Sequence, residues 1–196
     1  MVRRFRPSRA CRCCQTGVRL SIVPTRDAPR FACPVQVEGP THFFLLAVWS
    51  KTDLHYRYVE AVHRAVDCYS DLIAEQPAII IGDFNSNRLW DYKRPPDQNH
   101  TGLVRKLAAM GIVSAYHDFF SEDHGSETRP TLYFRKSQRQ TYHIDYCFLP
   151  TAWRAYMRSV ELGSYNDWIA SSDHVPLCVD LELPKSHRRT ARAGAV

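Results

Sequence analysis

The pattern of hydrophobic and polar residues predicts a layered fold, and its most informative part is residues 78–87. There the sequence is Ala-Ile-Ile-Ile-Gly-Asp-Phe-Asn-Ser-Asn, an uninterrupted apolar run that ends at a glycine. The consecutive isoleucines at 79–81 are typical of a strand that is buried on both faces. Gly82 permits a tight turn at the end of this strand. The pattern therefore predicts that Asp83 and Asn85 lie at the edge of a sheet.

A long amphipathic helix is predicted immediately before this strand. Between residues 53 and 76, apolar side chains recur at steps of three and four, and charged side chains occupy the opposite side. Thr52 or Asp53 is the expected N-cap, and Pro77 ends the helix. A strand over residues 41–49, this helix and the buried strand then form a crossover. Such a crossover indicates an α/β layered fold whose active edge lies at the strand ends.

The rest of the chain alternates short strands and loops with one further helix. Thr101 is expected to cap that helix, and Gly111 is expected to end it. Residues 88–99 and 118–130 are expected to be loops. The remaining predicted strands cover residues 17–23, 31–37, 112–117, 131–134, 141–149, 159–162 and 175–183. The prediction is thus mostly β structure packed in layers, with two substantial helices outside.

Length and charge indicate one domain between two basic tails. A chain of 196 residues can bury a full hydrophobic core in a single domain. The net charge of +6 comes from the ends, because residues 1–30 hold eight Arg against one Asp and residues 185–196 hold four basic residues and no acid. We therefore expect disordered tails over residues 1–16 and 185–196, around a domain over residues 17–184. The acidic body argues against tight binding of a nucleic-acid duplex.

The sequence favours a cytoplasmic protein without membrane insertion. No apolar run approaches the roughly 20 residues of a membrane helix, and the first residues lack the apolar segment of a secretory signal. The seven cysteines have no regular spacing, which is typical of free thiols rather than of a disulfide framework. The oligomeric state is left open by these patterns.

Candidate chemistry lies at three predicted strand boundaries. Asp83 and Asn85 follow the buried strand, Asp145 lies within the apolar run 142–149, and Asp173 and His174 precede the last strand. A carboxylate beside a buried strand is costly unless it has a partner or a task. Carboxylate and amide oxygens suit a hard ion such as Mg²⁺, and an imidazole can carry a proton or stabilise charge. This set of groups is what the hydrolysis of a phosphate ester requires.

Each motif also has a purely structural interpretation. The Gly-Asp-Phe-Asn stretch alone could be a turn in which Asp and Asn cap backbone amides, and Ser-Asp-His alone could cap a helix or turn. His100 and His117 are interpreted as surface or packing residues. Trp49 and Trp168 are interpreted as core or rim aromatics, with contact to a base or sugar left open. The occurrence of three such motifs in one order outweighs these separate interpretations.

Gly-Asp-Phe-Asn, then His-Ile-Asp-Tyr, then Ser-Asp-His resemble the motifs of the endonuclease/exonuclease/phosphatase superfamily, the deoxyribonuclease I-like phosphodiesterases. The resemblance extends over about residues 48–183. It implies an α/β (α+β) fold, namely a layered β-sandwich flanked by helices, which here is expected to lack its N-terminal portion. It also implies hydrolysis of a phosphate ester with Mg²⁺ or Mn²⁺, with nucleic acid as one open choice of substrate.

The same resemblance implies a role for each site residue. Asp83 would orient or deprotonate the attacking water, and Asn85 would hold the scissile phosphate. Asp145 would hydrogen-bond His174, fix its tautomer and raise its pKa. Asp173 would lie near the metal, for which Asp83 is the other expected residue.

The sequence departs from the superfamily in its first part. Members normally have a strand that ends in asparagine and a later segment that ends in glutamate, and both residues anchor the metal. Neither is recognisable here, and Trp49-Ser50 stands where many members have His or Tyr. Two hypotheses follow. One is a metal-dependent phosphodiesterase or phosphatase, and the other is a truncated, catalytically impaired relative that serves at most as a nucleic-acid-binding or interaction module.

Overall fold

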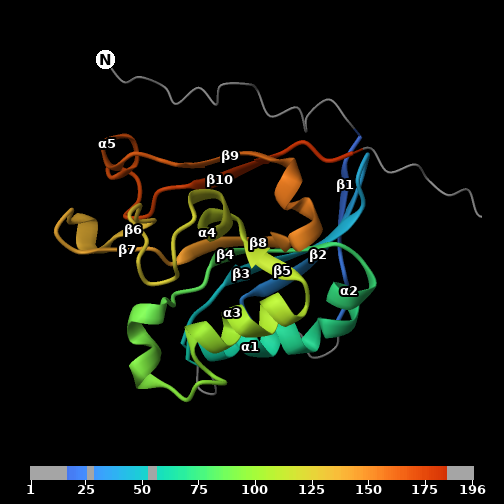
Figure 1. The fold of residues 1–196 in the computed structure, drawn as a ribbon, viewed down its shortest axis with the longest axis horizontal. Helices are drawn as coiled ribbons and strands as arrows, with labels where there is room; N and C mark the ends of the chain where they lie inside the picture. The colour runs from blue at the N-terminus through green and yellow to red at the C-terminus, as the bar shows by residue number, and fades with distance from the viewer. Residues whose placement is uncertain (1–16, 26–28, 53–56, 185–196) are drawn as a thin grey trace, which may run out of the picture.

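The computed structural model describes residues 17–25, 29–52 and 57–184, and it is built on a six-stranded sheet (Figure 1). The strands of this sheet lie in the order β1, β2, β3, β4, β8, β5. Their bounds are β1 Arg19–Ile22, β2 Ala32–Glu38, β3 Phe43–Trp49, β4 Ala78–Asp83, β5 Ile112–Ser114 and β8 Asp145–Pro150. Strands β3 and β4 run parallel, and the other neighbouring pairs run antiparallel. The basic tails predicted over residues 1–16 and 185–196 lie outside the described residues.

Two small sheets and several helices complete the layers. Strands β9 and β10, Met157–Leu162 and Leu177–Leu181, pair antiparallel, as do β6 and β7, Leu132–Tyr133 and Thr141–Tyr142. The helices are α1 Val59–Cys68, α2 Ser70–Glu75, α3 His100–Ala109, α4 Ala115–Phe120 and α5 Tyr165–Trp168. None of these described helices has the length and apolar character needed to cross a membrane.

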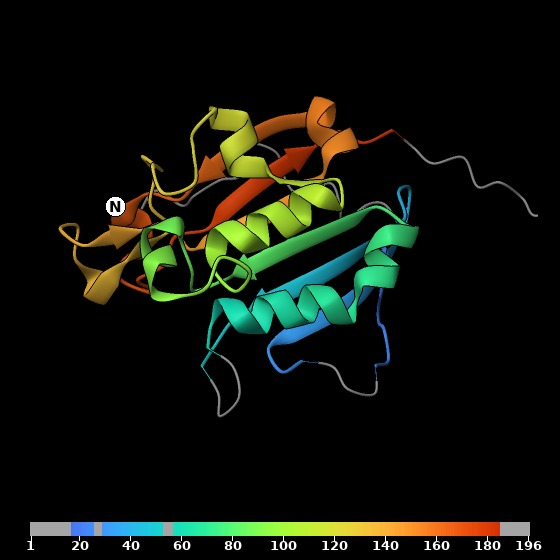
Figure 2. The same cartoon turned by 60° about the horizontal axis from the view of Figure 1, so that its bottom comes forward.

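The main sheet is covered on both faces, so the predicted layered fold is confirmed. Helices α1 and α3 cover one face, and the β9–β10 pair and α4 lie on the other (Figures 1 and 2). Strand β4 shows why, because Ile80 is fully buried toward the helices while Ile79, 8% exposed, packs toward β9 and β10. The apolar run of β4 therefore serves two cores, as expected for a strand without a solvent face.

Gly82 is required by the close approach of β3 to β4. Its φ is +139°, a backbone conformation that other residues rarely adopt. A Cβ atom at this position would lie 1.9 Å from the carbonyl oxygen of Val48 in β3. The glycine thus permits the strand pair to stay together up to the register position of Trp49 and Asp83.

The helix predicted over residues 53–76 is shorter and interrupted. Helix α1 begins at Val59, and Tyr69 separates it from α2. The predicted N-cap Thr52 lies outside any helix, Tyr58 occupies that position without a side-chain cap, and Asp53 lies outside the described residues. The helix is interrupted where the ring of Tyr69 is buried against Phe44, with centroids 5.8 Å apart.

Other boundaries also differ from the predicted ones. Asn99, not Thr101, caps α3, because its Oδ1 accepts a hydrogen bond from the backbone N–H of Gly102. The strand predicted over residues 112–117 ends at Ser114, where α4 follows. The strand predicted over residues 141–149 divides into β7 and β8, which belong to different sheets. Residues 88–99, predicted as a loop, contain the 3-10 helix Arg88–Lys93.

Candidate functional site

Two carboxylates meet where β4 and β8 pair. Asp83 is the last residue of β4, and Asp145 is the first residue of β8. The two are direct partners in the antiparallel register, so their backbones lie side by side at one edge of the main sheet. His174 reaches the same edge from a bridge with Leu132. Residues that are distant in the sequence therefore share one place in the fold.

Asp83, Asp145 and His174 form what we call the carboxylate cluster. One ligand atom from each, a carboxylate oxygen or a ring nitrogen, lies within 4.8 Å of the others. Nδ1 of His174 is 2.9 Å from Oδ2 of Asp145. All three side chains are partly buried, which places them at the surface of the core rather than inside it. The structure thus brings together three of the residues that the sequence singled out.

Asn85 joins the cluster through Asp83. Its backbone N–H donates to Oδ1 of Asp83 at 2.8 Å, and its Nδ2 donates to Oδ2 of Asp83 at 2.7 Å. The same Nδ2 also donates to the carbonyl oxygen of Ser50 at 2.8 Å. Asn85 has a φ of +45°, in the left-handed region that asparagine tolerates. The backbone N–H and one side-chain N–H of Asn85 thus hold the carboxylate, and the other side-chain N–H is bonded to Ser50.

Asp173 and His143 lie outside the carboxylate cluster. The carbonyl oxygen of Asp173 accepts a hydrogen bond from the N–H of Tyr133, and its carboxylate is not one of the three convergent groups. Its charge nevertheless helps to raise the pKa of His174. His143 is buried, and its Nδ1 lies 2.8 Å from the carbonyl oxygen of Arg129. The structure therefore places His143 in packing rather than at this site.

The electrostatics of the cluster suit proton transfer near neutral pH. Burial and the negative charge of Asp145 raise the pKa of Asp83 to about 6. The hydrogen bond with Asp145 raises the pKa of His174 above its ordinary value. A carboxylate whose pKa lies close to neutrality can accept a proton and release it again. The imidazolium beside it can stabilise negative charge.

Thr131 positions both halves of the cluster, and sequence reasoning missed it. Its fully buried Oγ1 accepts hydrogen bonds from the N–H groups of Ile144 and Asp145, at 3.0 and 3.1 Å. Its carbonyl oxygen accepts a hydrogen bond from the N–H of Val175 at 2.8 Å. One residue thus fixes the segments that carry Asp145 and His174. A threonine after a proline gives no local sequence signal for this role.

Two hollows border the cluster. A cavity of about 300 Å³ is lined by Asp145 and His174 and also by Trp168, whose Nε1 is buried without a partner among the described residues. A larger groove of about 640 Å³ begins at Asn85. The aromatic and basic residues that line this groove are Tyr58, Trp90, Phe134, Tyr142, His100, Arg57, Lys93 and Arg94.

This layered sheet with a cluster of acids and an imidazole at its edge is the deoxyribonuclease I-like fold, as comparison with solved structures confirms. The endonuclease domain of TRAS1, a telomere-specific non-LTR retrotransposon, has a TM-score of 0.59 at 15% identity, over 86% of this chain and 69% of that one. The 3′ phosphatase NExo from Neisseria, bound to a product DNA hairpin, has a TM-score of 0.55 at 14% identity, over 85% and 71%. The 3′-5′ exonuclease NExo from Neisseria meningitidis gives 0.53 at 14% identity, also over 85% and 71%.

The predicted resemblance is thereby confirmed at the level of the fold. The covered share of the solved chains, 69% to 71%, is consistent with the expectation that part of the superfamily's N-terminal portion has no counterpart here. No protein-family model and no curated protein sequence matches the chain.

Proposed function

We propose that this protein is a divalent-metal-dependent phosphoesterase that hydrolyses a phosphodiester or phosphomonoester. The observation that supports this most is the convergence of Asp83, Asp145 and His174 at one sheet edge, within 4.8 Å of one another. Their order along the chain agrees with the motifs of the superfamily whose fold the protein has. If these residues only capped turns or helices, their side chains would not need to converge.

The donor set fits a hard divalent ion. Asp83 and Asp145 are like charges at directly opposed positions, and the charge of Asp145 disfavours ionisation of Asp83. A cation offsets this repulsion, and oxygen ligands are those that Mg²⁺ and Mn²⁺ prefer. Asp83 would hold the ion, with Asp173 as the further acid expected near it. When bound, the ion supplies charge neutralisation for the phosphoryl oxygens.

Asp83, His174 and Asn85 would have separate roles in the reaction. Asp83, held by Asn85 in a fixed orientation, accepts the proton of the attacking water. His174 is fixed through Nδ1 by Asp145, which leaves Nε2 to donate to a phosphoryl oxygen. Asn85 is a positioning residue in this arrangement, since both of its amide N–H groups are occupied. Contact of Asn85 with the scissile phosphate requires it to release Ser50.

Nucleic acid is the substrate class that the adjoining groove favours. Aromatic rings such as Trp90 and Tyr142, with centroids 5.0 Å apart, suit contact with bases or sugars, and Arg57 and Lys93 suit contact with phosphates. The similar solved structures are an endonuclease domain, a 3′ phosphatase with product DNA and a 3′-5′ exonuclease. Their likeness in fold supports the same substrate class for this chain.

A second candidate function is binding without hydrolysis. The superfamily's N-terminal asparagine and glutamate are not recognisable in the sequence, so the metal site here would have fewer protein ligands. The groove beside Asn85 could bind a nucleic-acid strand without any catalytic step. Under this alternative the carboxylate cluster is a remnant of the fold.

Hydrolysis by metal-stripped protein during titration with Mg²⁺ and Mn²⁺ separates the two candidates. The substrates are bis(p-nitrophenyl) phosphate and a single-stranded oligonucleotide. We expect metal-dependent turnover that Asp83→Asn abolishes and that Asp180→Asn, a change of an exposed acid on β10, retains. Absence of turnover in wild type, or equal turnover in Asp83→Asn, would contradict the phosphoesterase. Oligonucleotide binding at low salt without turnover would support the second candidate.

A further inference from the structure

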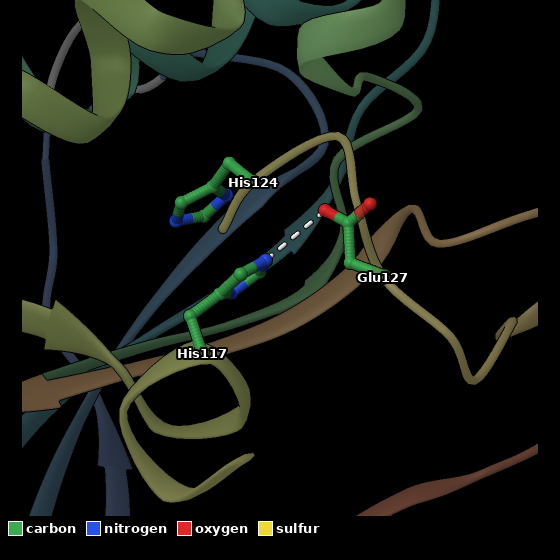
Figure 3. Close-up of side chains that lie close together, drawn as sticks. All are labelled: His117, His124 and Glu127. Carbon is green, nitrogen blue, oxygen red and sulfur yellow. Dashed lines mark hydrogen bonds and ion pairs between the residues drawn. The ribbon is translucent and has the colours of Figure 1, made fainter. Parts of the chain in front are cut away.

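A second group of convergent side chains lies on α4 and the loop that follows it. His117, His124 and Glu127 each offer one ligand atom, and these atoms lie within 4.8 Å of one another (Figure 3). Nε2 of His117 is 3.0 Å from Oε1 of Glu127, and the rings of His117 and His124 stack with centroids 3.5 Å apart. We call these three residues the histidine cluster. It shares no residue with the carboxylate cluster.

Serine hydroxyl groups contact Nδ1 of His117 and Nδ1 of the neighbouring His100. Nδ1 of His117 lies 2.7 Å from Oγ of Ser114, so Nε2 is the atom turned toward Glu127. His100, at the start of α3, repeats this arrangement, because its Nδ1 lies 3.0 Å from Oγ of Ser86. A ligating histidine characteristically has its other ring nitrogen fixed in this way.

A third imidazole lies beside His124. Nε2 of His100 lies 3.1 Å from Nδ1 of His124. Within the cluster, Nε2 of His117 and Oε1 of Glu127 are 3.0 Å apart. Tetrahedral bonds of about 2.1 Å to one ion separate ligand atoms by about 3.4 Å, which is close to this separation.

We propose that His117, His124 and Glu127 bind one Zn²⁺ ion, with a water molecule as the fourth ligand. Imidazole and carboxylate ligands favour Zn²⁺ over Mg²⁺, which prefers oxygen ligands alone. His124 is partly exposed, so the ion can reach the site from solvent. The ion would connect α4 to the loop over residues 121–131, and so hold the loop that leads to Thr131.

Metal content tests this assignment. The full chain is exposed to Zn²⁺, freed of excess ion by gel filtration, and measured by elemental analysis. We expect about one tightly held zinc per chain in wild type and its loss in His124→Ala and Glu127→Gln. Asp83→Asn and the exposed control His42→Ala should retain it. No zinc in wild type, or equal zinc in all variants, would overturn the proposal.

Cobalt substitution tests the same site without any variant. Wild-type protein reconstituted with Co²⁺ should show the intense visible absorption of a tetrahedral ion, and added Zn²⁺ should remove it. Zn²⁺ should also raise the midpoint of thermal unfolding of wild type more than Mg²⁺ does. A Co²⁺ spectrum typical of an octahedral ion, or none, would overturn the assignment even if the variants failed to fold.

Discussion

The carboxylate cluster and the histidine cluster have similar sizes and opposite charge balance. The first combines two acids with one imidazole, and the second combines one acid with two imidazoles and a third close by. Burial acts on both, but it raises the pKa of Asp83 and lowers the pKa values of His100 and His124. Burial therefore favours the neutral form of the buried group in both regions.

The two clusters also differ in how far their surroundings are open to a substrate. The carboxylate cluster lies between a cavity and a groove, where a substrate can approach. In the histidine cluster, His117 contacts Ser114 and Glu127 accepts a hydrogen bond from Asn87. Ser86 contacts the neighbouring His100. The polar atoms of this cluster therefore mostly contact protein. The comparison indicates that one region is open to a substrate, while the polar atoms of the other mostly contact protein.

The largest expected effect comes from removing the imidazole of the carboxylate cluster. His174→Ala should lower kcat/KM for bis(p-nitrophenyl) phosphate about 10²- to 10⁴-fold, since it removes a positioned proton donor. Its zinc content should equal that of wild type. Steady-state kinetics and elemental analysis check both statements, with His42→Ala as the control. Loss of zinc in His174→Ala would show that the two clusters are not separate.

The next effect concerns two glycines with positive φ, Gly82 and Gly111. Gly82→Ala should reduce the free energy of unfolding by about 3 kcal/mol or more, because its Cβ atom would collide with the backbone of β3. Gly111→Ala, before β5, should cost only about 1 kcal/mol, since its φ is +74° but the space is open. Urea unfolding measures both, and equal costs would contradict the packing described for Gly82.

A smaller effect on stability and activity is expected at Thr131, which follows the loop of the histidine cluster and supports the carboxylate cluster. Thr131→Val removes the acceptor of two buried N–H groups and should cost about 1–3 kcal/mol of stability. Because Asp145 loses its support, kcat/KM should fall about tenfold while zinc is retained. Thr151→Val, which changes an exposed hydroxyl, is the matched control. Unchanged kinetics in Thr131→Val would remove its positioning role.

The smallest effect is the pH dependence of stability. The folded pKa of Asp83, about 6, exceeds its ordinary value of 3.8, so its stabilising contribution is present below about pH 4 and is lost as the pH rises through 6. In metal-free buffer, the free energy of unfolding of Asp83→Asn should therefore rise relative to that of wild type by about 1–2 kcal/mol between about pH 4 and pH 7, after allowance for solvent screening. Chemical unfolding at several pH values measures this gain. A difference that shrinks with rising pH would contradict the raised pKa.

The sequence predicted the carboxylate cluster because its residues follow strong local patterns. The isoleucines of β4 define a buried strand, and the register of β4 with β8 then places Asp83 opposite Asp145. Element ends were predicted less well, since they depend on tertiary contacts. The ring of Tyr69 interrupts the long helix, and Oγ1 of Thr131 supports the start of β8 through the N–H groups of Ile144 and Asp145.

The histidine cluster could not be predicted in the same way. His117 was interpreted as a surface or packing residue, and the residues around His124 and Glu127 as an acidic loop. Local sequence shows no strand boundary there, and the residues converge only because α4 forms where a strand was expected. His100 comes from another helix altogether. Contacts of this kind are set by the tertiary fold rather than by a motif.

The most direct test of the central claim is a double-mutant cycle on Asp145 and His174, with kcat/KM for metal-dependent phosphodiester hydrolysis as the readout. If Asp145 acts by holding His174, the variant Asp145→Asn/His174→Ala should be no slower than His174→Ala alone. Losses that multiply in the double variant would show that the two residues act independently, and would contradict a single convergent site.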